Sequence, residues 1–231
     1  MTDLDHEKKI AALEAIKYVE DGMVIGLGTG STAQFMIRAL GERVLTGLKI
    51  RGVPSSETTR ELALECGIPL IPLEDGKRID VTIDGADEFD PYLQLIKGGG
   101  GALLHEKILA YNSHLYIIIA DSKKRVDRLG TFKLPVETIP FATPIIIQTL
   151  MNIGIRPVLR KNNGEVFITQ EGNYIIDLDI HHITNLTELE RKLKQIPGIV
   201  ETGLFLGMAD IIIMGKEKGT VIWKFENGIR F

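Results

Sequence analysis

Short apolar segments alternate with amphipathic segments through the first half of this 231-residue chain. The apolar segments have the length of buried strands, and the segments between them repeat hydrophobic residues at helical spacing. Strands and helices that alternate at these lengths form a parallel sheet with helices on both faces. The pattern predicts strands over residues 23–27, 49–53, 69–73, 80–83 and 115–120, and helices over residues 7–19, 31–45, 56–66 and 101–111.

The rhythm changes after about residue 130. The pattern there predicts strands over residues 133–139, 156–160, 174–179 and 199–204, helices over 143–151 and 185–195, and a further short strand over 165–169. The order β-α-β-β-α-β is typical of ferredoxin-like domains. Two more strands follow, over residues 210–214 and 220–225. We therefore predict a Rossmann-like α/β catalytic domain of residues 1–130 plus 206–231, with a smaller ferredoxin-like α+β domain of residues 131–205 inserted into it.

Composition and charge narrow the class of protein. Hydrophobic residues make up 44% and charged residues 25%, as in ordinary soluble globular proteins. The net charge is −4 without a basic tract, so we expect no nucleic-acid partner. The apolar runs are too short to span a bilayer and the N-terminus has no signal-peptide pattern, so we expect no membrane association. The single cysteine, Cys66, fits a reducing compartment, which predicts a cytoplasmic location.

A loop of small residues joins the first predicted strand to the next helix, with the sequence Gly-Leu-Gly-Thr-Gly-Ser-Thr from Gly26 to Thr32. Small residues let a ligand approach the backbone, and a helix N-terminus offers N–H groups to a phosphate. Thr29, Gly30, Ser31 and Thr32 are therefore candidate phosphate ligands. Ser31 stands where the dinucleotide fingerprint needs glycine, and the Walker A lysine is missing. The alternative is a tight turn with Ser31 or Thr32 as the helix N-cap.

An acidic turn, Asp-Gly-Ala-Asp-Glu from Asp84 to Glu88, follows the strand predicted over residues 80–83. It falls at the carboxyl edge of the sheet, where open α/β sheets bind ligands. Asp84 and Asp87 are candidate catalytic carboxylates, with Gly85 and Ala86 between them. The alternatives are a surface turn and a metal site. We disfavour a metal because the calcium-loop spacing fails and no histidine lies at ligand spacing.

A lysine and four glycines follow ten residues later, from Lys97 to Gly101. Glycine runs have an entropic cost, so four together indicate a backbone shaped for a ligand. Their N–H groups can form an anion-binding nest, and Lys97 adds a positive charge for an oxyanion. Glu106 follows on a predicted helix. In a partly desolvated cleft its pKa would rise toward ~6–7, which suits a general base. The alternatives are a solvated loop lysine and a helix-surface glutamate.

Five ordered motifs resemble the type A ribose-5-phosphate isomerases over essentially the whole chain. They are G-x-G-T-G-S-T, D-G-A-D-E, K-G-G-G-G-A-L-x-x-E-K, A-D-x-x-K and L-P-V-E. The resemblance implies interconversion of D-ribose 5-phosphate and D-ribulose 5-phosphate in the non-oxidative pentose phosphate pathway, with no metal and no organic cofactor. It also implies a homo-oligomer, either a dimer or a tetramer.

The resemblance also implies roles for individual residues. Glu106 matches the proton acceptor that moves a proton between C1 and C2 through a cis-enediol(ate). Asp84 matches the carboxylate that assists ring opening, and Asp87 the one that holds sugar hydroxyls. Lys97 with Gly98, Gly99 and Gly100 matches the segment that stabilises negative charge.

The remaining matches concern the substrate loop and two lysines. The residues from Thr29 to Thr32 match the family's substrate loop. Lys8, or its neighbour Lys9, matches a lysine that approaches the phosphate. The family often reads D-x-S-K where this chain has Asp-Ser-Lys-Lys, and counting from Asp121 selects Lys124 as the substrate lysine. Some members carry Thr-Arg where this chain has Leu-His, so we expect His105 to be a helix-surface residue.

Two other classes of function remain open at this point. One is a non-catalytic sugar-phosphate sensor, although no helix-turn-helix pattern or basic stripe precedes the domain. The other is a related enzyme, such as an amino-sugar phosphate deaminase or a coenzyme A transferase. A rate measurement with ribose 5-phosphate separates these from an isomerase, and Ser31 makes a nicotinamide enzyme the least favoured reading. The small domain carries no chemical motif, which indicates a packing or oligomerisation role.

Overall fold

The computed structural model describes residues 2–73 and 78–225, and its contacts group the chain into two compact units. Unit 1 contains Met1–Ala86, His105–Arg125 and Gly207–Phe231, and unit 2 contains Asp87–Leu104 and Val126–Leu206. The sequence pattern predicts residues 87–104 in the larger domain, whereas their contacts group them with unit 2. The division into a catalytic and a small domain stays a prediction.

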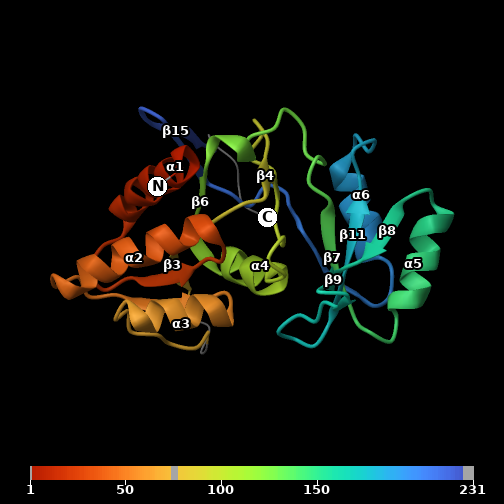
Figure 1. Cartoon of the computed structure of the whole chain (residues 1–231), viewed down its shortest axis with the longest axis horizontal. Coiled ribbons are helices and arrows are strands. Elements are labelled where there is room, and N and C mark those ends of the chain that lie inside the picture. Colours follow the sequence, from red (N-terminus) through yellow and green to blue (C-terminus); the bar gives the residue numbers. More distant parts are fainter. Residues whose placement is uncertain (1, 74–77, 226–231) are drawn as a thin grey trace. The chain divides into compact units, whose positions relative to one another are not determined.

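Unit 1 is built on a six-stranded sheet with the order β15-β14-β6-β3-β1-β2. Figure 1 labels β15, β6 and β3 of this sheet. Neighbouring strands are parallel except for the antiparallel pair β14 and β15. This confirms the predicted mostly parallel α/β sheet. The strands are β1 (Val24–Leu27), β2 (Arg51–Pro54), β3 (Ile79–Asp84), β6 (Ser113–Ala120), β14 (Ile211–Lys216) and β15 (Gly219–Lys224).

Helices cover both faces of this sheet. They are α1 (Asp3–Ala15), continued by the short helix η1 (Ile16–Tyr18), α2 (Ser31–Leu45), α3 (Glu57–Glu65) and α4 (Leu103–Tyr111), and a further short helix, η2 (Ser122–Lys124), follows β6. Ala11 of α1 and Met36 of α2 belong to the same buried cluster as Ile25 of β1. Leu109 of α4 packs instead with Val24. Because successive strand side chains point to opposite faces, α4 lies on the face opposite to α1 and α2.

The strand predicted over residues 69–73 is wrong. Within that stretch a single bridge joins Leu70 to Gly52 of β2. The N–H of Gly52 donates to the Pro69 carbonyl, and the N–H of Ile71 donates back to the Gly52 carbonyl. Pro72 has no N–H to continue the ladder, so pairing stops after this exchange.

Unit 2 contains a four-stranded antiparallel sheet with the order β12-β7-β11-β8. Its elements follow as β7 (Leu134–Thr138), α5 (Thr143–Asn152), β8 (Arg156–Leu159), β11 (Tyr174–Asp179), α6 (Leu186–Lys194) and β12 (Ile199–Thr202). This confirms the predicted β-α-β-β-α-β order. Leu150 of α5 and Leu193 of α6 share one buried cluster with Val136 and Ile176 of the sheet.

Unit 2 contains two further small sheets that the sequence pattern does not predict or predicts only in part. A two-stranded hairpin pairs β9 (Lys161–Asn162) with β10 (Glu165–Val166), of which only the second strand was expected. A three-stranded sheet has the order β13-β5-β4, from β4 (Glu88–Phe89), β5 (Leu95–Ile96) and β13 (Leu204–Phe205). Strands of two residues are too short to show an alternating pattern.

Candidate active site

Asp84 ends β3 and is completely buried. Its Oδ1 accepts hydrogen bonds from the N–H of Thr29, at 3.1 Å, and from the N–H of Gly85, at 2.7 Å. A Cβ at Gly28 would lie 2.1 Å from the same oxygen and 2.5 Å from the Asp84 Cα. Glycine is therefore required where the end of β1 passes Asp84. The predicted phosphate loop and the first predicted carboxylate form one local structure, and Gly85 and Ala86 continue the turn half-buried.

The side chain of Thr29 is enclosed by hydroxyl groups from the start of α3. Its Oγ1 lies 2.7 Å from the Ser55 Oγ, 2.8 Å from the Ser56 Oγ and 3.2 Å from the Thr59 Oγ1. The Thr59 hydroxyl in turn donates to the carbonyl of Gly28, at 2.9 Å. These bonds hold the loop in place. A substrate contact of Thr29 stays a prediction, and the hydroxyl-rich run Ser-Ser-Glu-Thr-Thr after β2 was the signal for the cluster that sequence reasoning missed.

The N-terminus of α2 is capped by the backbone of Gly30 rather than by a side chain. Gly30 has φ of +105° and is the N-cap, so the alternative with Ser31 or Thr32 as N-cap is wrong. Ser31 is exposed and Thr32 is buried in the first turn. A helix start without a side-chain cap presents its N–H groups and its positive dipole end to an anion. This geometry suits a phosphate group.

A buried glutamate brings together the segments that carry the two predicted substrate lysines. The Glu7 Oε2 accepts a hydrogen bond from the N–H of Ser122 at 2.8 Å, which joins α1 to η2. Lys8 follows Glu7, and Lys124 ends η2. Both are half-buried, whereas the neighbouring Lys9 and Lys123 are exposed. The structure thus favours Lys8 and Lys124 as the enclosed lysines.

The sequence did not point out Glu7 as the residue that joins these two segments. The sequence showed it only as the start of a helix predicted over residues 7–19. Asp121 is also buried, and its Oδ1 accepts the N–H of Lys123 at 3.0 Å as the cap of η2. The Asp-Ser-Lys-Lys motif is therefore held at its first residue by capping and at its second by Glu7.

Glu106 lies in the first turn of α4 with 5% of its surface exposed. The sequence left open whether this glutamate belongs to the surface of the helix, and the structure places it inside. Its carboxylate is therefore largely removed from bulk water.

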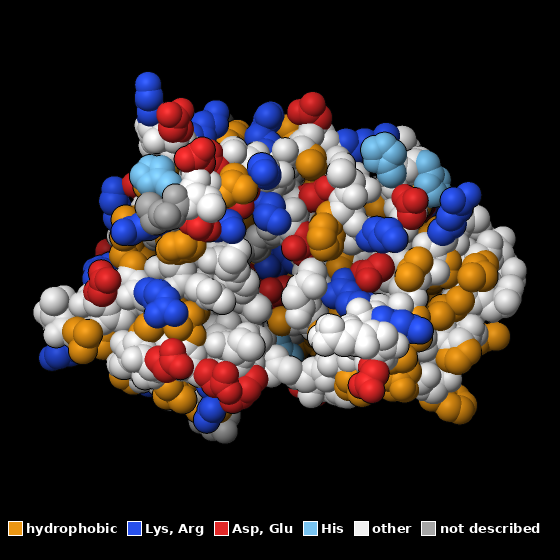
Figure 2. Space-filling view, in the orientation of Figure 1, with side chains coloured by type: hydrophobic (Ala, Val, Ile, Leu, Met, Phe, Trp, Pro, Cys, Tyr) orange, Lys and Arg blue, Asp and Glu red, His pale blue; other side chains and the backbone are white. Residues whose placement is uncertain are grey.

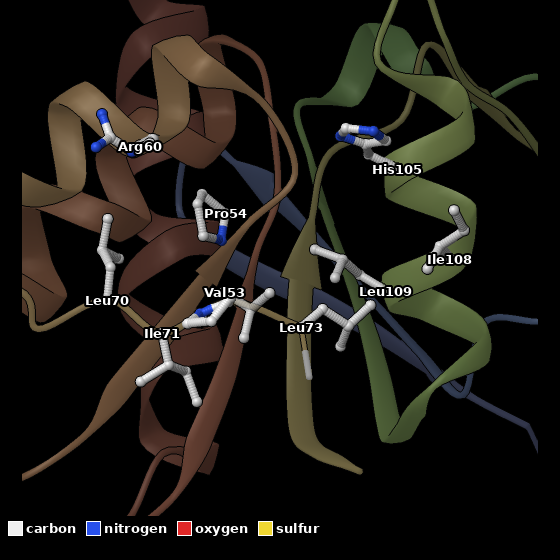
Figure 3. A pocket seen from close by; sticks show the side chains of 10 residues that line it. Val53, Pro54, Arg60, Leu70, Ile71, Leu73, His105, Ile108 and Leu109 are labelled. Atoms are coloured by element: carbon white, nitrogen blue, oxygen red, sulfur yellow. The ribbon is translucent and has the colours of Figure 1, made fainter. Parts of the chain in front are cut away.

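A cavity of about 540 Å³ lies beside α4, in the part of unit 1 that carries β2 and residues 70–73. Figure 3 shows His105, Ile108 and Leu109 of α4 facing Val53 and Pro54 across it. The sequence predicted His105 as a helix-surface residue; it is half-buried and lines this cavity. The lining is mainly apolar and includes none of the predicted site residues. This chemistry does not suit a sugar phosphate.

Lys97 of unit 2 follows β5 and has 2% of its surface exposed. Its N–H donates to the Gly203 carbonyl at 2.9 Å, and its Nζ lies 5.6 Å from the centre of the Phe205 ring. A cation at this distance over an aromatic ring is attracted by the ring's electrons. Lys97 is thus an enclosed cation rather than the solvated loop lysine of the alternative reading. No pattern in the sequence indicated that Phe205 lies beside Lys97.

Asp87 and the glycine run form a second local structure in unit 2. The Asp87 Oδ2 accepts the N–H of Gly99 at 2.7 Å, and the N–H of Gly101 donates to the Gly98 carbonyl at 3.0 Å. A Cβ at Gly99 would lie 2.6 Å from the Asp87 Oδ1. Two N–H groups of the run are therefore used within unit 2. The predicted anion-binding nest is reduced to the N–H groups of Gly98 and Gly100.

Residues 2–73 and 78–225 contain neither a metal-binding cluster nor a membrane-spanning helix. No group of three or more His, Cys, Asp or Glu side chains in this part of the chain is arranged to hold a metal ion. No helix among the same residues is long and apolar enough to cross a membrane.

Comparisons with known proteins agree on one family. The family model described as ribose 5-phosphate isomerase A (phosphoriboisomerase A) matches residues 51–219. The ribose-5-phosphate isomerase A of Jannaschia sp. (strain CCS1) is 48% identical over 229 residues, which cover 96% of this chain and 87% of that protein. The protein of the same name from Nitrobacter hamburgensis is 49% identical over 223 residues, covering 94% of this chain and 96% of the relative.

Solved structures give the same result. A D-ribose-5-phosphate isomerase in complex with phospho-erythronic acid is 42% identical, with a TM-score of 0.93 over 97% of this chain and 100% of that one. The ribose 5-phosphate isomerase from Plasmodium falciparum is 39% identical, with the same TM-score and coverage. This chain, with its Rossmann-like sheet and its ferredoxin-like unit, therefore belongs to the ribose 5-phosphate isomerase A family.

Proposed function

We propose that this chain interconverts D-ribose 5-phosphate and D-ribulose 5-phosphate, with Glu106 moving a proton between C1 and C2 through a cis-enediolate. The burial of Glu106 in the first turn of α4 is the observation that carries this proposal. A base that works on a sugar carbon must compete with water for the proton. Burial keeps the Glu106 carboxylate away from bulk water.

Three further residues supply the other parts of the reaction. Asp84, fixed by two backbone N–H groups, assists opening of the sugar ring. Asp87 holds sugar hydroxyls, and the buried Lys97 stabilises the negative oxygen of the enediolate. Asp84 and Asp87 are three residues apart, so the chain itself keeps their Cα atoms within about 11 Å of one another.

The phosphate of the substrate is proposed to bind at the start of α2. Gly30, Ser31 and Thr32 supply N–H groups there, and Lys8 and Lys124 supply charge. Phospho-erythronic acid, the ligand in the complex of one relative, combines a phosphate with a carboxylate. A planar carboxylate resembles an enediolate in shape and charge, so the same ligand is a suitable probe for this chain. No metal or organic cofactor enters the proposed mechanism.

The test is a coupled rate measurement on the purified chain with ribose 5-phosphate, with and without a chelator. We expect the wild type to be active and unaffected by chelation. Glu106→Gln should lower kcat by on the order of 10²-fold or more while the protein stays folded. Glu61→Gln, an exposed glutamate on α3, is the matched control and should behave as the wild type.

The outcomes separate the parts of the proposal. A wild type that is inactive with ribose 5-phosphate would refute the activity itself. An active wild type with a fully active Glu106→Gln variant would leave the activity standing and remove Glu106 from its role. Loss of activity on chelation would contradict the metal-free mechanism.

We further propose that the chain forms a homo-oligomer through an apolar surface on and around α5. Phe141 is 95% exposed and Ile145 64% exposed, and Met151, Ile153 and Val158 are also exposed. Figure 2 shows hydrophobic side chains gathered over α5, at the right of the view. Contiguous apolar surface of this kind marks protein interfaces.

Light scattering after gel filtration tests the oligomer. Ile145→Lys should lower the measured mass, whereas Leu45→Lys, at an exposed leucine of α2, should not. An unchanged mass for Ile145→Lys would exclude this surface. A cytoplasmic location is also proposed, on the basis of the single cysteine, and cell fractionation tests it.

A further inference from the structure

Arg160 is a partly buried arginine of unit 2 that no motif of the sequence pointed out. It follows β8, and its side chain is 12% exposed. The carboxylate of Asp177 on β11 accepts two hydrogen bonds from the guanidinium, from Nε to Oδ2 at 3.0 Å and from Nη2 to Oδ1 at 2.5 Å. The ring of Phe167 lies 5.8 Å from the guanidinium carbon. Paired hydrogen bonds of this kind fix the plane of the guanidinium as well as its position.

The remaining nitrogen of this fixed group points at the glycine run. The Arg160 Nη1 donates to the carbonyl of Gly98 at 2.8 Å and to the carbonyl of Gly99 at 3.1 Å. A trans peptide group is planar, with its C=O and N–H pointing in opposite directions. Holding the Gly98 carbonyl therefore directs the N–H of Gly99 away from Arg160, and that N–H is the one bonded to Asp87.

The same argument applies to the next peptide group. With the Gly99 carbonyl on Arg160, the N–H of Gly100 also points away from the guanidinium. That N–H belongs to the predicted anion-binding nest. Glycines lose more conformational freedom on ordering than other residues, so the run needs such external restraints. Phe167 adds one, because a Cβ at Gly101 would lie 2.3 Å from the tip of its ring.

We propose that Arg160 is a positioning residue for the isomerase reaction, which orients the peptide groups of Gly98 to Gly100 so that Lys97 and the nest meet the enediolate. Asp177 positions Arg160 in turn. The proposal rests on the roles proposed above for Lys97 and the glycine run. A lysine cannot replace the arginine, because two nitrogens are needed for Asp177 and a third for the carbonyls of Gly98 and Gly99.

The test compares Arg160→Ala and Arg160→Lys with Arg156→Ala, a control at an exposed arginine of β8. We expect kcat to fall by about 10²-fold in both Arg160 variants, with KM for ribose 5-phosphate changed by less than about threefold. Affinity for phospho-erythronic acid should fall by at least about tenfold, and affinity for inorganic phosphate should stay unchanged. A purely structural arginine would not separate these two ligands. Arg156→Ala should match the wild type.

Other outcomes overturn the inference. If folded Arg160→Ala keeps kcat within about threefold of the wild type, Arg160 has no positioning role. Equal weakening of both ligands would show a general loss of structure instead. Arg160→Lys and Asp177→Asn carry the test if Arg160→Ala does not fold. An inactive wild type refutes the proposed activity, and an unaffected Glu106→Gln variant refutes the base, so neither is confused with a failure here.

Discussion

Asp84 of unit 1 and the glycine run of unit 2 are held in place by different physical means. In unit 1, Asp84 is held by backbone N–H groups at the ends of neighbouring parallel strands. In unit 2, the glycine run is held by side chains, those of Asp87, Arg160 and Phe167. The first arrangement follows from strand order, whereas the second depends on particular side chains far apart in the sequence. A substitution that shifts the backbone beside Asp84 should therefore be strongly destabilising. Substitutions of the side chains around the glycine run should have smaller, graded effects on stability.

The largest effect is expected for Gly28→Ala in unit 1. The added Cβ would meet the Cα and the carboxylate of Asp84, and neither can move without shifting β3. We expect the free energy of unfolding to fall by about 3 kcal/mol or more. Gly22→Ala is the control, since its φ of +87° disfavours a side chain but a Cβ there meets nothing within 4 Å. It should cost about 1 kcal/mol. Similar values for the two variants in chemical denaturation would show that the close approach of Gly28 to Asp84 does not restrict the backbone there.

A smaller effect is expected for Gly101→Ala in unit 2. Its φ is +86°, and the added Cβ would meet only the far end of the Phe167 ring, which can rotate away. We expect a loss of about 2 kcal/mol in the free energy of unfolding. The double variant with Phe167→Leu should lose about 1 kcal/mol less free energy of unfolding than the sum of the losses of the two single variants. Strict additivity in this double-mutant cycle would mean that the ring does not restrain the loop.

Thr29→Val tests the hydroxyl cluster of unit 1. Valine keeps the shape of threonine but loses the bonds to Ser55, Ser56 and Thr59. Because those hydroxyls also bond to one another and to the backbone, we expect a loss of only about 1 kcal/mol in thermal or urea unfolding. Thr187→Val, at an exposed threonine of α6, is the control. A fully stable Thr29→Val variant would leave the hydroxyl with a substrate role alone.

The smallest effect concerns Asp90 of unit 2, whose pKa is raised by burial against the opposing effect of hydrogen bonds from Gln94 and Tyr92. The folded state therefore holds the proton more tightly than the unfolded state, and stability falls as pH rises through the window just above 3.8. Asp90→Asn keeps an oxygen that accepts the hydrogen bonds from Tyr92 and Gln94, and it removes the free-energy cost of burying a negative charge. Its stability relative to the wild type should rise by less than about 1 kcal/mol between pH 4 and pH 7.

Urea unfolding at the two pH values measures this difference. Glu165→Gln, at an exposed glutamate of β10, is the control and should show a constant difference from the wild type. A stability advantage of Asp90→Asn that shrinks as pH rises would reverse the sign of the argument.

The sequence predicted the unit 1 fold well because the fold follows from local signals, whereas the roles of its candidate residues stay predictions. Hydrophobic periodicity marks strands and helices, and residues such as Asp84 fall at strand ends, where parallel sheets bind ligands. The prediction failed at residues 69–73 because Pro72 ends the ladder despite an apolar pattern. Arg160 lies 62 residues from Gly98, and Phe205 lies still further from Lys97. Contacts over such separations leave no periodic signal, so the supports of the glycine run could not be predicted.

The interleaving of the two units in the sequence has a consequence for how the chain acquires its structure. The chain passes between the units after Ala86, Leu104, Arg125 and Leu206. Unit 2 lacks β12 and β13 until residue 205 has been made, and the unit 1 sheet lacks β14 until residue 216. During synthesis, neither unit can be completed well ahead of the other. A single pair of cuts also cannot excise unit 2, so the protein should resist dissection into separately folding halves.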